Sequence, residues 1–465
     1  MIRMDVRTVA EITGGHLMQN GASVEFQGIS TDSRTLQPGE LFIPLRGENF
    51  DGHDYLTQAI KRGAAACLSE EMIGGLLVPV VKVKDTLKAL GDLAAASRRQ
   101  FSGPVIGITG TSGKTTCKEM LASILTSLGP GLKSAGNYNN LIGVPLTLFE
   151  LQPEHQWAVV EMGMSARGEI ARLAEIARPN IGLITNIGAG HLENFDGLSG
   201  VARAKGELFI SLPVDGIALI NADDPQVSVL PVANGVRRVF FGNNRDADVR
   251  ADKIVVQNGS VSFQLVIAGS AQKVVLPLPG RHNVGNALAA AAAATVIGIG
   301  LQAIAAGLEA FQPCPGRMEL LEFPGDVVVL EDSYNANPLS VHAALDALHD
   351  LGAPGRRIAV LADMLELGPS GPELHKQIGA IVPERADWLF TYGTLAEDIA
   401  RGAREAGLDD DRIFSATSHD QLVARLLELL QAGDRVLIKG SRGMRMEKVT
   451  DALRNSTQRP AANGD

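Results

Sequence analysis

The sequence has little cysteine and no excess of positive charge. Its 465 residues include only three cysteines, Cys67, Cys117 and Cys314. Their odd number and wide spacing fit neither a disulfide framework nor a zinc site and are typical of a protein in a reducing compartment. The formal net charge of −10 at pH 7 lacks the basic excess of most nucleic-acid-binding proteins, so we expect no nucleic-acid partner. An anionic ligand would have to be held by a local positive site instead.

The sequence also lacks a targeting signal. Its first fifteen residues, MIRMDVRTVAEITGG, carry acidic side chains where a signal peptide has an apolar core. The stretch 287–308 is long enough to cross a bilayer, but most of its apolar residues are Ala, and it contains Gly298, Gly300 and Gln302. We expect two soluble helices joined at Gly298-Ile-Gly300, with a membrane span as the alternative. We therefore expect a cytoplasmic protein without membrane insertion.

What is present is an alternation of short apolar strands, glycine-rich turns and helices. The 45% hydrophobic and 20% charged content excludes disorder, collagen or coiled coil as the main architecture, and the length suggests about three domains. From residue 104 onward the alternation predicts parallel strands with crossover helices. We predict an α/β protein with a small mixed α/β N-terminal domain (1–100), a central domain with a mainly parallel sheet (101–313) and a Rossmann-like α/β C-terminal domain (314–465).

The individual elements follow from the same pattern. In the central domain we predict strands at 105–109, 158–161, 181–187 and 216–221, helices at 115–128 and 168–177, and antiparallel strands within 251–278. In the C-terminal domain we predict strands at 327–331, 357–361, 388–391 and 435–438 and a helix at 340–351. The polar tail 455–465 is typical of a frayed chain end.

A phosphate-binding loop lies at the start of the central domain. The predicted strand 105–109 runs through Gly110-Thr111-Ser112-Gly113 into Lys114-Thr115-Thr116 at the beginning of a helix. Glycines let backbone N–H groups surround phosphate oxygens, and the helix N-terminus adds positive potential. Lys114 can reach the phosphates and Thr115 can bind Mg²⁺. Ile108 replaces the first Gly of the usual motif, so an ordinary strand-to-helix turn is the alternative.

Four further side chains are ambiguous on their own. Glu161 ends the strand 158–161 and His191 follows the strand 181–187, so both lie at the sheet edge where open α/β sheets bind ligands. Their shared position beside the phosphate loop favours metal binding. Lys205 lies in a short helical stretch, where the residues alone favour a solvated surface lysine. Cys117 opens the helix after the loop, and we favour a packed, inert thiol over a reactive one.

Seen together, these segments resemble the Mur ligase family. The ATPase domain of that family is similar to TGTSGKTT (109–116), EMG (161–163), NIGAGHLENF (186–195), ARAKGE (202–207), NADD (221–224) and GRHNVGNALAA (280–290). Its C-terminal domain is similar to PGRMEL (315–320) and EDSYNANPLS (331–340). The motifs follow in order over nearly the whole chain, and the family's own loop explains the missing Gly at position 108.

Within the family, three segments resemble the branch that joins D-alanyl-D-alanine to UDP-N-acetylmuramoyl-tripeptide. They are NYNNLIGVPLTL (137–148), EDSYNANP with ADMLELG (331–338, 362–368) and KGSRGMRME (439–447). The segment 30–56 resembles the part that grips the UDP end of the substrate, which a folate-extending ligase should lack. A sister ligase that adds the third amino acid is the closest alternative, although the Asp-Asn-Pro-Arg signature of its diaminopimelate-adding form is absent. A P-loop ATPase that acts as a switch is the more distant alternative.

The resemblance implies a role for each matching residue. The ATP-binding residues would be Gly110, Thr111, Ser112, Gly113, Lys114, Thr115, Thr116, Asn283, Arg317 and Asp332. The substrate-binding residues would be Ser33 and Arg34 for the UDP end, and Asn137, Tyr138, Asn139 and Asn140 for the peptide end. The metal ligands would be Thr115, Glu161, His191 and Lys205. The catalytic residues would be Lys114, His191 and Lys205.

The resemblance also implies the chemistry. ATP would convert a substrate carboxylate to an acyl phosphate, which the amine of the dipeptide then attacks. Two Mg²⁺ ions would assist, and Lys205 would be carbamylated by CO₂, which turns a cation into a carboxylate-like ligand. We expect a monomer. The sequence leaves open the base that deprotonates the amine, the third amino acid of the tripeptide, and the roles of His282 and Lys439.

Overall fold

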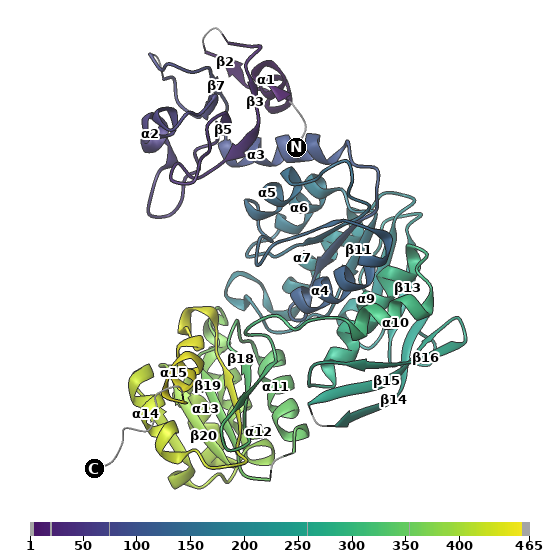
Figure 1. The fold of residues 1–465 in the computed structure, drawn as a ribbon, viewed down its shortest axis with the longest axis vertical. Helices are drawn as coiled ribbons and strands as arrows, with labels where there is room; N and C mark the ends of the chain where they lie inside the picture. Colours follow the sequence, from purple (N-terminus) through teal and green to yellow (C-terminus); the bar gives the residue numbers. More distant parts are fainter. Residues whose placement is uncertain (1–3, 19–20, 74, 258, 353, 458–465) are drawn as a thin grey trace.

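Three α/β domains follow one another along the molecule in the computed structural model, which describes residues 4–457 apart from 19–20, 74, 258 and 353 (Figure 1). Their main sheets lie within residues 16–82, 105–276 and 319–439. We propose the divisions predicted from the sequence, after residues 100 and 313, as the boundaries of the N-terminal, middle and C-terminal domains. The predicted frayed end begins inside the last helix, which runs to Thr457, and its remaining residues lie outside the described part.

The N-terminal domain is built on a five-stranded sheet with the order β2-β7-β6-β5-β4. The outer strand β2 pairs antiparallel with β7, and the other neighbours are parallel. The strands are β2 (His16–Leu17), β4 (Gly28–Ser30), β5 (Glu40–Phe42), β6 (Ala66–Ser69) and β7 (Val80–Lys82), with β1 (Met4–Asp5) and β3 (Glu25–Phe26) forming a separate pair. The helices are α1 (Val6–Thr13), α2 (Leu56–Lys61) and α3 (Thr86–Arg98).

The middle domain holds a nine-stranded sheet with the order β16-β15-β14-β13-β12-β11-β8-β10-β9. Every neighbouring pair from β9 at one edge to β14 is parallel. Strands β14, β15 and β16 pair antiparallel and form the antiparallel region expected within 251–278. The strands are β8 (Val105–Thr109), β9 (Leu132–Lys133), β10 (Ala158–Glu161), β11 (Ile181–Ile184), β12 (Ile217–Asn221), β13 (Arg237–Gly242), β14 (Val249–Gln257), β15 (Ser260–Ile267) and β16 (Ser270–Leu276).

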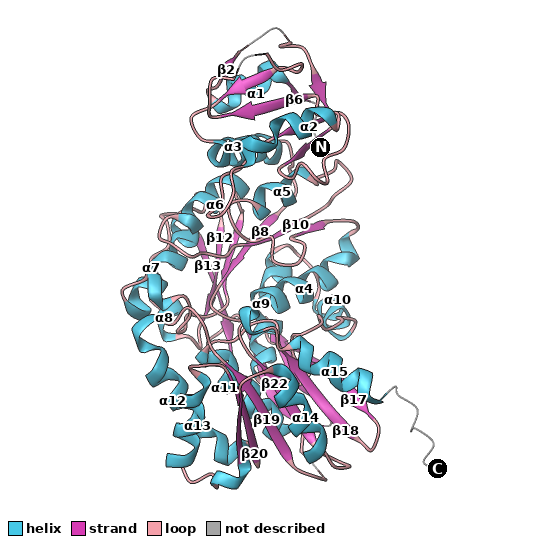
Figure 2. Ribbon diagram, turned by 90° about the vertical axis from the view of Figure 1, so that its left-hand side faces the viewer, coloured by secondary structure: helices cyan, strands magenta, loops and turns pink. Residues whose placement is uncertain are grey.

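Helices cover both faces of this sheet (Figure 2). The central strands read as continuous apolar runs because each face is buried: Val160 of β10 packs into one cluster, and its neighbour Val159 packs into the cluster on the opposite face. The helices are α4 (Lys114–Leu125), α5 (Gly143–Phe149), α6 (Glu169–Ala177), α7 (Gly197–Ile210), α8 (Pro225–Ser228), α9 (His282–Val296) and α10 (Leu301–Glu309). The predicted pair of helices on either side of Gly298-Ile-Gly300 is therefore confirmed, as α9 and α10.

The C-terminal domain has a six-stranded sheet with the order β17-β18-β22-β19-β20-β21, in which only β17 runs antiparallel to its neighbour. Helices again lie on both faces (Figure 2). The strands are β17 (Glu319–Phe323), β18 (Val327–Asp332), β19 (Arg357–Ala362), β20 (Trp388–Tyr392), β21 (Ile413–Ala416) and β22 (Arg435–Lys439). The helices are α11 (Pro338–Asp350), α12 (Gly371–Arg385), α13 (Ala396–Glu405), α14 (His419–Leu429) and α15 (Glu447–Thr457).

Three predicted elements differ from the observed ones by more than one residue. Strand β11 ends at Ile184 rather than at residue 187, because the next polar side chains turn toward the phosphate loop. The predicted helix 115–128 is α4 followed by a short 3₁₀ turn, η2 (Thr126–Leu128). The predicted helix 340–351 begins earlier, because Asn337 caps it and Pro338 occupies its first turn.

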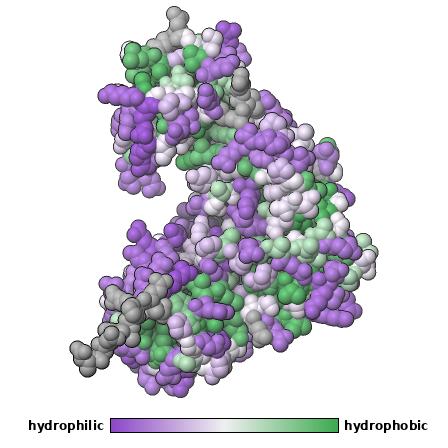
Figure 3. Space-filling model, viewed as in Figure 1, coloured by the Kyte–Doolittle hydropathy of each residue, from purple (hydrophilic) through white to green (hydrophobic). Residues whose placement is uncertain are grey.

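The space-filling view shows a deep notch on one side of the molecule, between the N-terminal and C-terminal domains (Figure 3). The middle domain forms the back of this notch, and much of the surface around it is hydrophilic. Within the described residues, none of the helices combines the length and apolarity that a bilayer span requires. The alternative of a membrane span at 287–308 is thus not supported.

Candidate functional site

The phosphate loop connects β8 to α4, as predicted. Two of its glycines have backbone conformations that side chains rarely adopt, with φ of +149° at Gly110 and +80° at Gly113. There is also no room for a side chain at either position. A Cβ on Gly110 would lie 1.9 Å from the Thr185 hydroxyl oxygen, and one on Gly113 would lie 2.1 Å from the Asn286 side-chain oxygen. The loop therefore needs glycine at both positions for its path into the helix.

Thr185 and Asn186, which the sequence did not single out, hold this loop from the end of the neighbouring strand β11. The Thr185 hydroxyl donates to the Ser112 carbonyl at 2.6 Å. Asn186 accepts from the Ser112 N–H at 2.9 Å and donates to the Ser112 carbonyl at 3.0 Å. Both directly follow β11, and polar residues at the carboxyl end of a buried parallel strand were the signal that could have found them.

Two lysines converge on the same loop carbonyl. Lys114 Nζ donates to the Gly110 carbonyl at 2.7 Å, and Lys205 Nζ donates to it at 3.0 Å. Lys205 is only 2% exposed, so the solvated surface lysine favoured by the residues alone was wrong. Among the described residues, neither ammonium forms an ion pair with a carboxylate.

Burial gives these ammonium groups unusual pKa values. Burial lowers the pKa of Lys205 well below its ordinary value, and the neighbouring Lys114 charge adds to the effect. Burial also lowers the pKa of Lys114, opposed by Glu161 and assisted by Arg317. Two lysine side chains beside a helix N-terminus, neither of them paired with a carboxylate among the described residues, fit an anionic ligand such as a triphosphate.

Glu161 lies at the end of β10, as predicted, and faces the first turn of α4. Its two carboxylate oxygens accept from the Thr115 hydroxyl at 2.8 Å and from the Asn139 amide at 2.9 Å. The buried Lys118 Nζ lies 3.7 Å from the same carboxylate and donates to the Ser134 carbonyl at 2.7 Å. Hydroxyl and carboxylate oxygens are the donors that Mg²⁺ prefers, so Thr115 and Glu161 fit this ion.

His191 lies beside the phosphate loop but contacts the C-terminal domain. The loop before it is held by Thr111, whose hydroxyl accepts from the Gly188 N–H at 2.9 Å. His191 Nδ1 itself lies 2.5 Å from a carboxylate oxygen of Glu366, and this hydrogen bond lowers the pKa of Glu366. The part of the chain that the structure describes has no group of three His, Cys, Asp or Glu side chains placed to hold a metal. A complete metal site therefore requires oxygens from other side chains or from a ligand.

Of the predicted peptide-end residues, the structure brings one to Glu161. Asn139 donates to that carboxylate, whereas Asn140 accepts from the Ile142 and Gly143 N–H groups at the start of α5. Tyr138 is 45% exposed. No hydrogen bond within the described residues involves the side chain of Asn137.

The predicted nucleotide-binding Asn283 lies at the start of α9 and is fully buried. Its side chain donates to the Pro279 carbonyl at 2.7 Å and accepts from Asn286 at 2.9 Å. Asn286 in turn faces Gly113 of the phosphate loop. Asn283 therefore supports the loop through a neighbour.

The C-terminal domain reaches the loop through Asn337, which the sequence analysis did not single out. The Asn337 amide donates to the Ser112 hydroxyl at 3.0 Å. The predicted residues Arg317 and Asp332 are engaged nearby: the Arg317 guanidinium lies 3.9 Å from the Tyr334 ring centre, and Asp332 pairs with the buried Lys439. The sequence assigned no role to Lys439, and the structure shows that it pairs with Asp332, a predicted site residue.

The predicted UDP-end residues lie in the N-terminal domain, after β4. The Ser33 hydroxyl is buried and donates to Gln58 at 3.2 Å. The Arg34 side chain is 81% exposed and pairs with Asp32 at 2.8 Å. This guanidinium is therefore accessible from solvent.

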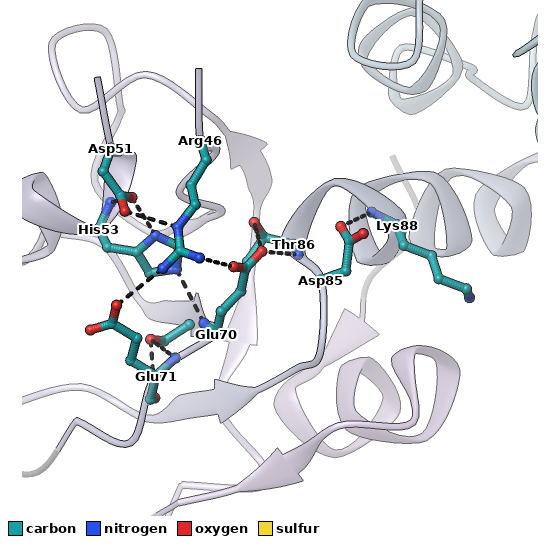
Figure 4. Close-up of polar contacts among 9 residues, drawn as sticks. Arg46, Asp51, His53, Glu70, Glu71, Asp85, Thr86 and Lys88 are labelled. Carbon is teal, nitrogen blue, oxygen red and sulfur yellow. Dashed lines mark hydrogen bonds and ion pairs between the residues drawn. The ribbon is translucent and has the colours of Figure 1, made fainter. Parts of the chain in front are cut away.

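A polar network orders the loop that follows β5 in the same domain (Figure 4). The Arg46 guanidinium pairs with Asp51, Glu70 and Glu71 at 2.9–3.0 Å. His53 is buried, with Nδ1 2.6 Å from Asp51 and Nε2 accepting from the Glu70 N–H at 3.1 Å. Although burial tends to raise it, the pKa of Asp51 falls to about 2, because His53 and Arg46 donate hydrogen bonds to the carboxylate.

The three cysteines are free thiols. Cys117 is buried at the start of α4, and burial raises the pKa of its thiol. The predicted packed thiol is thus confirmed, and its inertness stays a prediction that the raised pKa supports.

Comparisons with known proteins cover nearly the whole chain. Residues 25–98, 108–294 and 316–442 match the families described as "Mur ligase family, catalytic domain", "Mur ligase middle domain" and "Mur ligase, glutamate ligase domain". The UDP-N-acetylmuramoyl-tripeptide–D-alanyl-D-alanine ligase of Escherichia coli is 40% identical, covering 98% of this chain and 99% of the relative. The corresponding ligase of Bacillus subtilis is 36% identical over 97% and 99%.

Solved structures give the same result. A crystal structure of MurF from Acinetobacter baumannii has a TM-score of 0.91 and 33% identity, covering 98% of this chain and 99% of that one. A UDP-N-acetylmuramoyl-L-alanyl-D-glutamate–2,6-diaminopimelate ligase has a TM-score of 0.57 at 20% identity over 98% and 100%, a likeness that shows the fold alone.

Proposed function

Because the chain belongs to the Mur ligase family, we propose that it uses ATP to join D-alanyl-D-alanine to UDP-N-acetylmuramoyl-tripeptide in peptidoglycan precursor synthesis. The observation that carries this proposal is the 40% identity, over 98% of the chain, to a ligase named for that reaction. In this proposal the reaction takes place in the cytoplasm, and the enzyme acts as a monomer.

Joining a free carboxylate to an amine is uphill in water, so the acid must first be activated. The tripeptide carboxylate attacks the γ-phosphate of ATP, which forms an acyl phosphate and releases ADP. The neutral amine of the dipeptide then attacks the acyl carbon, and the tetrahedral intermediate expels phosphate. Because an acyl phosphate is readily hydrolysed, the site must exclude water during this sequence.

The phosphate loop provides binding and charge for the first step. Loop N–H groups from Gly110 to Thr116 surround the phosphates, and Lys114 turns from the loop carbonyl toward them. Its positive charge offsets the repulsion between the attacking carboxylate and the phosphate anions. Asn337 reaches Ser112 from the C-terminal domain, so docking of this domain closes the loop against water.

Two magnesium ions belong to this proposal, with Thr115 and Glu161 holding one and His191 and carbamylated Lys205 contributing to the other. When bound, these ions would supply charge neutralisation and orientation of the phosphates. The hydroxyl of Thr115 and the carboxylate of Glu161 already lie 2.8 Å apart, which supports their shared role.

Lys205 is the residue that we propose to be carbamylated. The neutral amine attacks CO₂ and loses a proton, which leaves a carbamate anion. Burial favours the neutral, nucleophilic form of this amine by lowering its pKa. The anion would then neutralise the adjacent Lys114 cation.

The modification is tested by intact-protein and peptide mass spectrometry under CO₂ and by the Lys205→Ala variant. We expect a mass gain of one CO₂ on Lys205, and an inactive variant that a short carboxylic acid partly restores. An unmodified Lys205 in a nucleotide complex, together with no rescue, would contradict the proposal.

The remaining assignments are part of the same proposal. Arg317 and Asp332 contact the nucleotide, and Asn283 supports nucleotide binding through Asn286 and the phosphate loop. Asn137, Tyr138, Asn139 and Asn140 line the peptide end of the acceptor. Ser33 and Arg34 contact the uridine diphosphate. The exposed guanidinium of Arg34 supports its part, because it can pair with a diphosphate at little desolvation cost.

A phosphate-release assay tests the function as a whole. We expect release that requires both UDP-N-acetylmuramoyl-tripeptide and D-alanyl-D-alanine, with a product whose mass is the sum of the two substrates minus water. Turnover with a free amino acid in place of the dipeptide would indicate the sister ligase. ATP hydrolysis that needs neither substrate would indicate a P-loop switch.

A further inference from the structure

Two short segments meet where the C-terminal domain rests on the middle domain. One is the loop at His191, which continues into η3 (Leu192–Asn194), and the other precedes η4 (Gly368–Ser370). The Glu193 N–H donates to the Glu366 carbonyl at 3.3 Å, and a Cβ on Gly368 would lie 3.1 Å from the Glu193 Cα. The backbones are thus in direct contact beside the ion pair of His191 with Glu366.

Both members of this pair have an unfavourable backbone conformation. His191 has φ of +57° and Glu366 has φ of +65°, in the left-handed region that is uncommon for residues other than Gly and in which His is found more often than Glu. Such conformations persist where the surrounding structure enforces them, and they cluster at functional sites. Here the two residues face one another across a domain junction, so each helps to hold the other in place.

The contact determines which histidine nitrogen carries the proton. An ionised carboxylate can only accept hydrogen bonds, so Nδ1 of His191 must donate to Glu366. In the neutral ring this leaves Nε2 with a free lone pair, which is the form that binds a metal. Histidines that ligate metals commonly donate their other N–H to a carboxylate in this way.

We infer that Glu366 is a positioning residue, which holds His191 in the Nδ1–H form with Nε2 available to a divalent cation only when the C-terminal domain is docked. The inference rests on the proposed function, which makes His191 a metal ligand. The inference gives a role to Glu366, a side chain of the C-terminal domain that was not among the predicted site residues. Metal binding and domain docking then favour one another, because each stabilises the same arrangement of His191.

The first test reads the histidine directly, in full-length protein without metal or substrate. Nitrogen-15 spectra of protein labelled at histidine distinguish the two tautomers, and the His191→Gln variant assigns the signal. We expect the Nδ1–H form in the wild type and in Glu366→Gln, whose amide oxygen still accepts the hydrogen bond. Glu366→Ala should shift the ring toward the Nε2–H form.

Glu193→Ala is the matched control, because it removes the same charge two residues from His191 without touching the ring. It should leave the His191 signal unchanged. An unchanged tautomer in Glu366→Ala, or an equal change in Glu193→Ala, would overturn the inference.

The second test measures Mn²⁺ binding to the ADP complex by electron paramagnetic resonance of the free ion. Glu366→Ala should weaken binding about tenfold, the usual effect of losing a carboxylate behind a metal-bound histidine. Glu366→Gln should recover most of this loss, and Glu193→Ala should show none.

The His191→Gln variant distinguishes the positioning role of Glu366 from the metal-binding role of His191. If it weakens Mn²⁺ binding while Glu366→Ala does not, the positioning role of Glu366 is wrong and the metal assignment stands. If neither variant changes Mn²⁺ binding, the assignment of His191 in the proposed function is wrong, and the inference falls with it.

Discussion

The two domain junctions of this molecule are built from different interactions. Between the N-terminal and middle domains, a single apolar cluster contains buried residues of both, with Met4 as its first member along the chain and Leu230 as its last. Arg98 at the end of α3 adds hydrogen bonds to the carbonyls of Ala177 and Arg178 at the end of α6. At this junction, apolar burial joins the two domains into one core.

The middle and C-terminal domains meet mainly through polar contacts. The apolar clusters of the C-terminal domain contain only residues from 318 onward among those described. The contacts across the junction include Ser112 with Asn337, His191 with Glu366 and Arg281 with Asp350. Polar contacts can be exchanged for water at small cost, whereas an apolar core cannot be opened cheaply. From this comparison we expect a fixed N-terminal domain and a C-terminal domain that can close and open over the proposed nucleotide site.

The largest effect should come from the phosphate loop at the polar junction. Lys114→Ala should lower kcat by at least about 10³-fold, because the cation that offsets phosphate repulsion is lost. The melting temperature should stay the same or rise, because a desolvated charge is removed. Steady-state kinetics and calorimetry check the two parts. Near-normal turnover would contradict the loop assignment.

A pair of leucine and isoleucine variants compares the junctions directly. Ile176 is buried in α6 and packs against Gly91 of α3, where a Cβ would lie 2.7 Å from it. Ile176→Ala should cost about 2–5 kcal/mol of unfolding free energy through the cavity it leaves. Leu339, which covers Gly188 from the C-terminal domain, is 42% exposed, so Leu339→Ala should cost less than about 1 kcal/mol. Denaturant unfolding measures both, and equal costs would remove the distinction between the junctions.

The closing contact of the C-terminal domain should have a smaller effect, on activity alone. Asn337→Ser keeps an N-cap for α11 but is too short to reach Ser112, so kcat/KM should fall about tenfold. The control is Ser340→Ala, which loses the reciprocal cap within α11 but no contact with the loop. A loss of stability without a loss of kcat/KM in Asn337→Ser would mean that the contact is only structural.

The smallest effect should lie inside the N-terminal domain, away from both junctions. The pKa of Asp51 is lowered to about 2, so its carboxylate stabilises the folded state fully above its ordinary value near 4 and loses this effect as the pH falls toward 2. Asp51→Asn should lower the unfolding free energy by about 1 kcal/mol at neutral pH, since the side chain is partly exposed. The difference from the wild type should shrink below about pH 4. A difference that is constant with pH would contradict this account of the Arg46 network.

Much of the fold was predictable because its signals are local. Strands β8 and β10 had the predicted bounds, since each is an apolar run that ends at polar residues. The predictions failed where the partner of a side chain lies far away in the sequence. The strand predicted at 181–187 ends at Ile184, because Thr185 and Asn186 form hydrogen bonds with Ser112. Lys205 had the pattern of a surface lysine and was placed in the site only by the family resemblance.

The sequence by itself determined the phosphate loop and the order of the elements, because glycine, lysine and apolar spacing act within a few residues of one another. Only the tertiary structure decided that Lys205 is buried against the Gly110 carbonyl and that His191 pairs with Glu366 of the next domain. Desolvation and contacts between domains depend on where distant segments pack, and no local pattern specifies that.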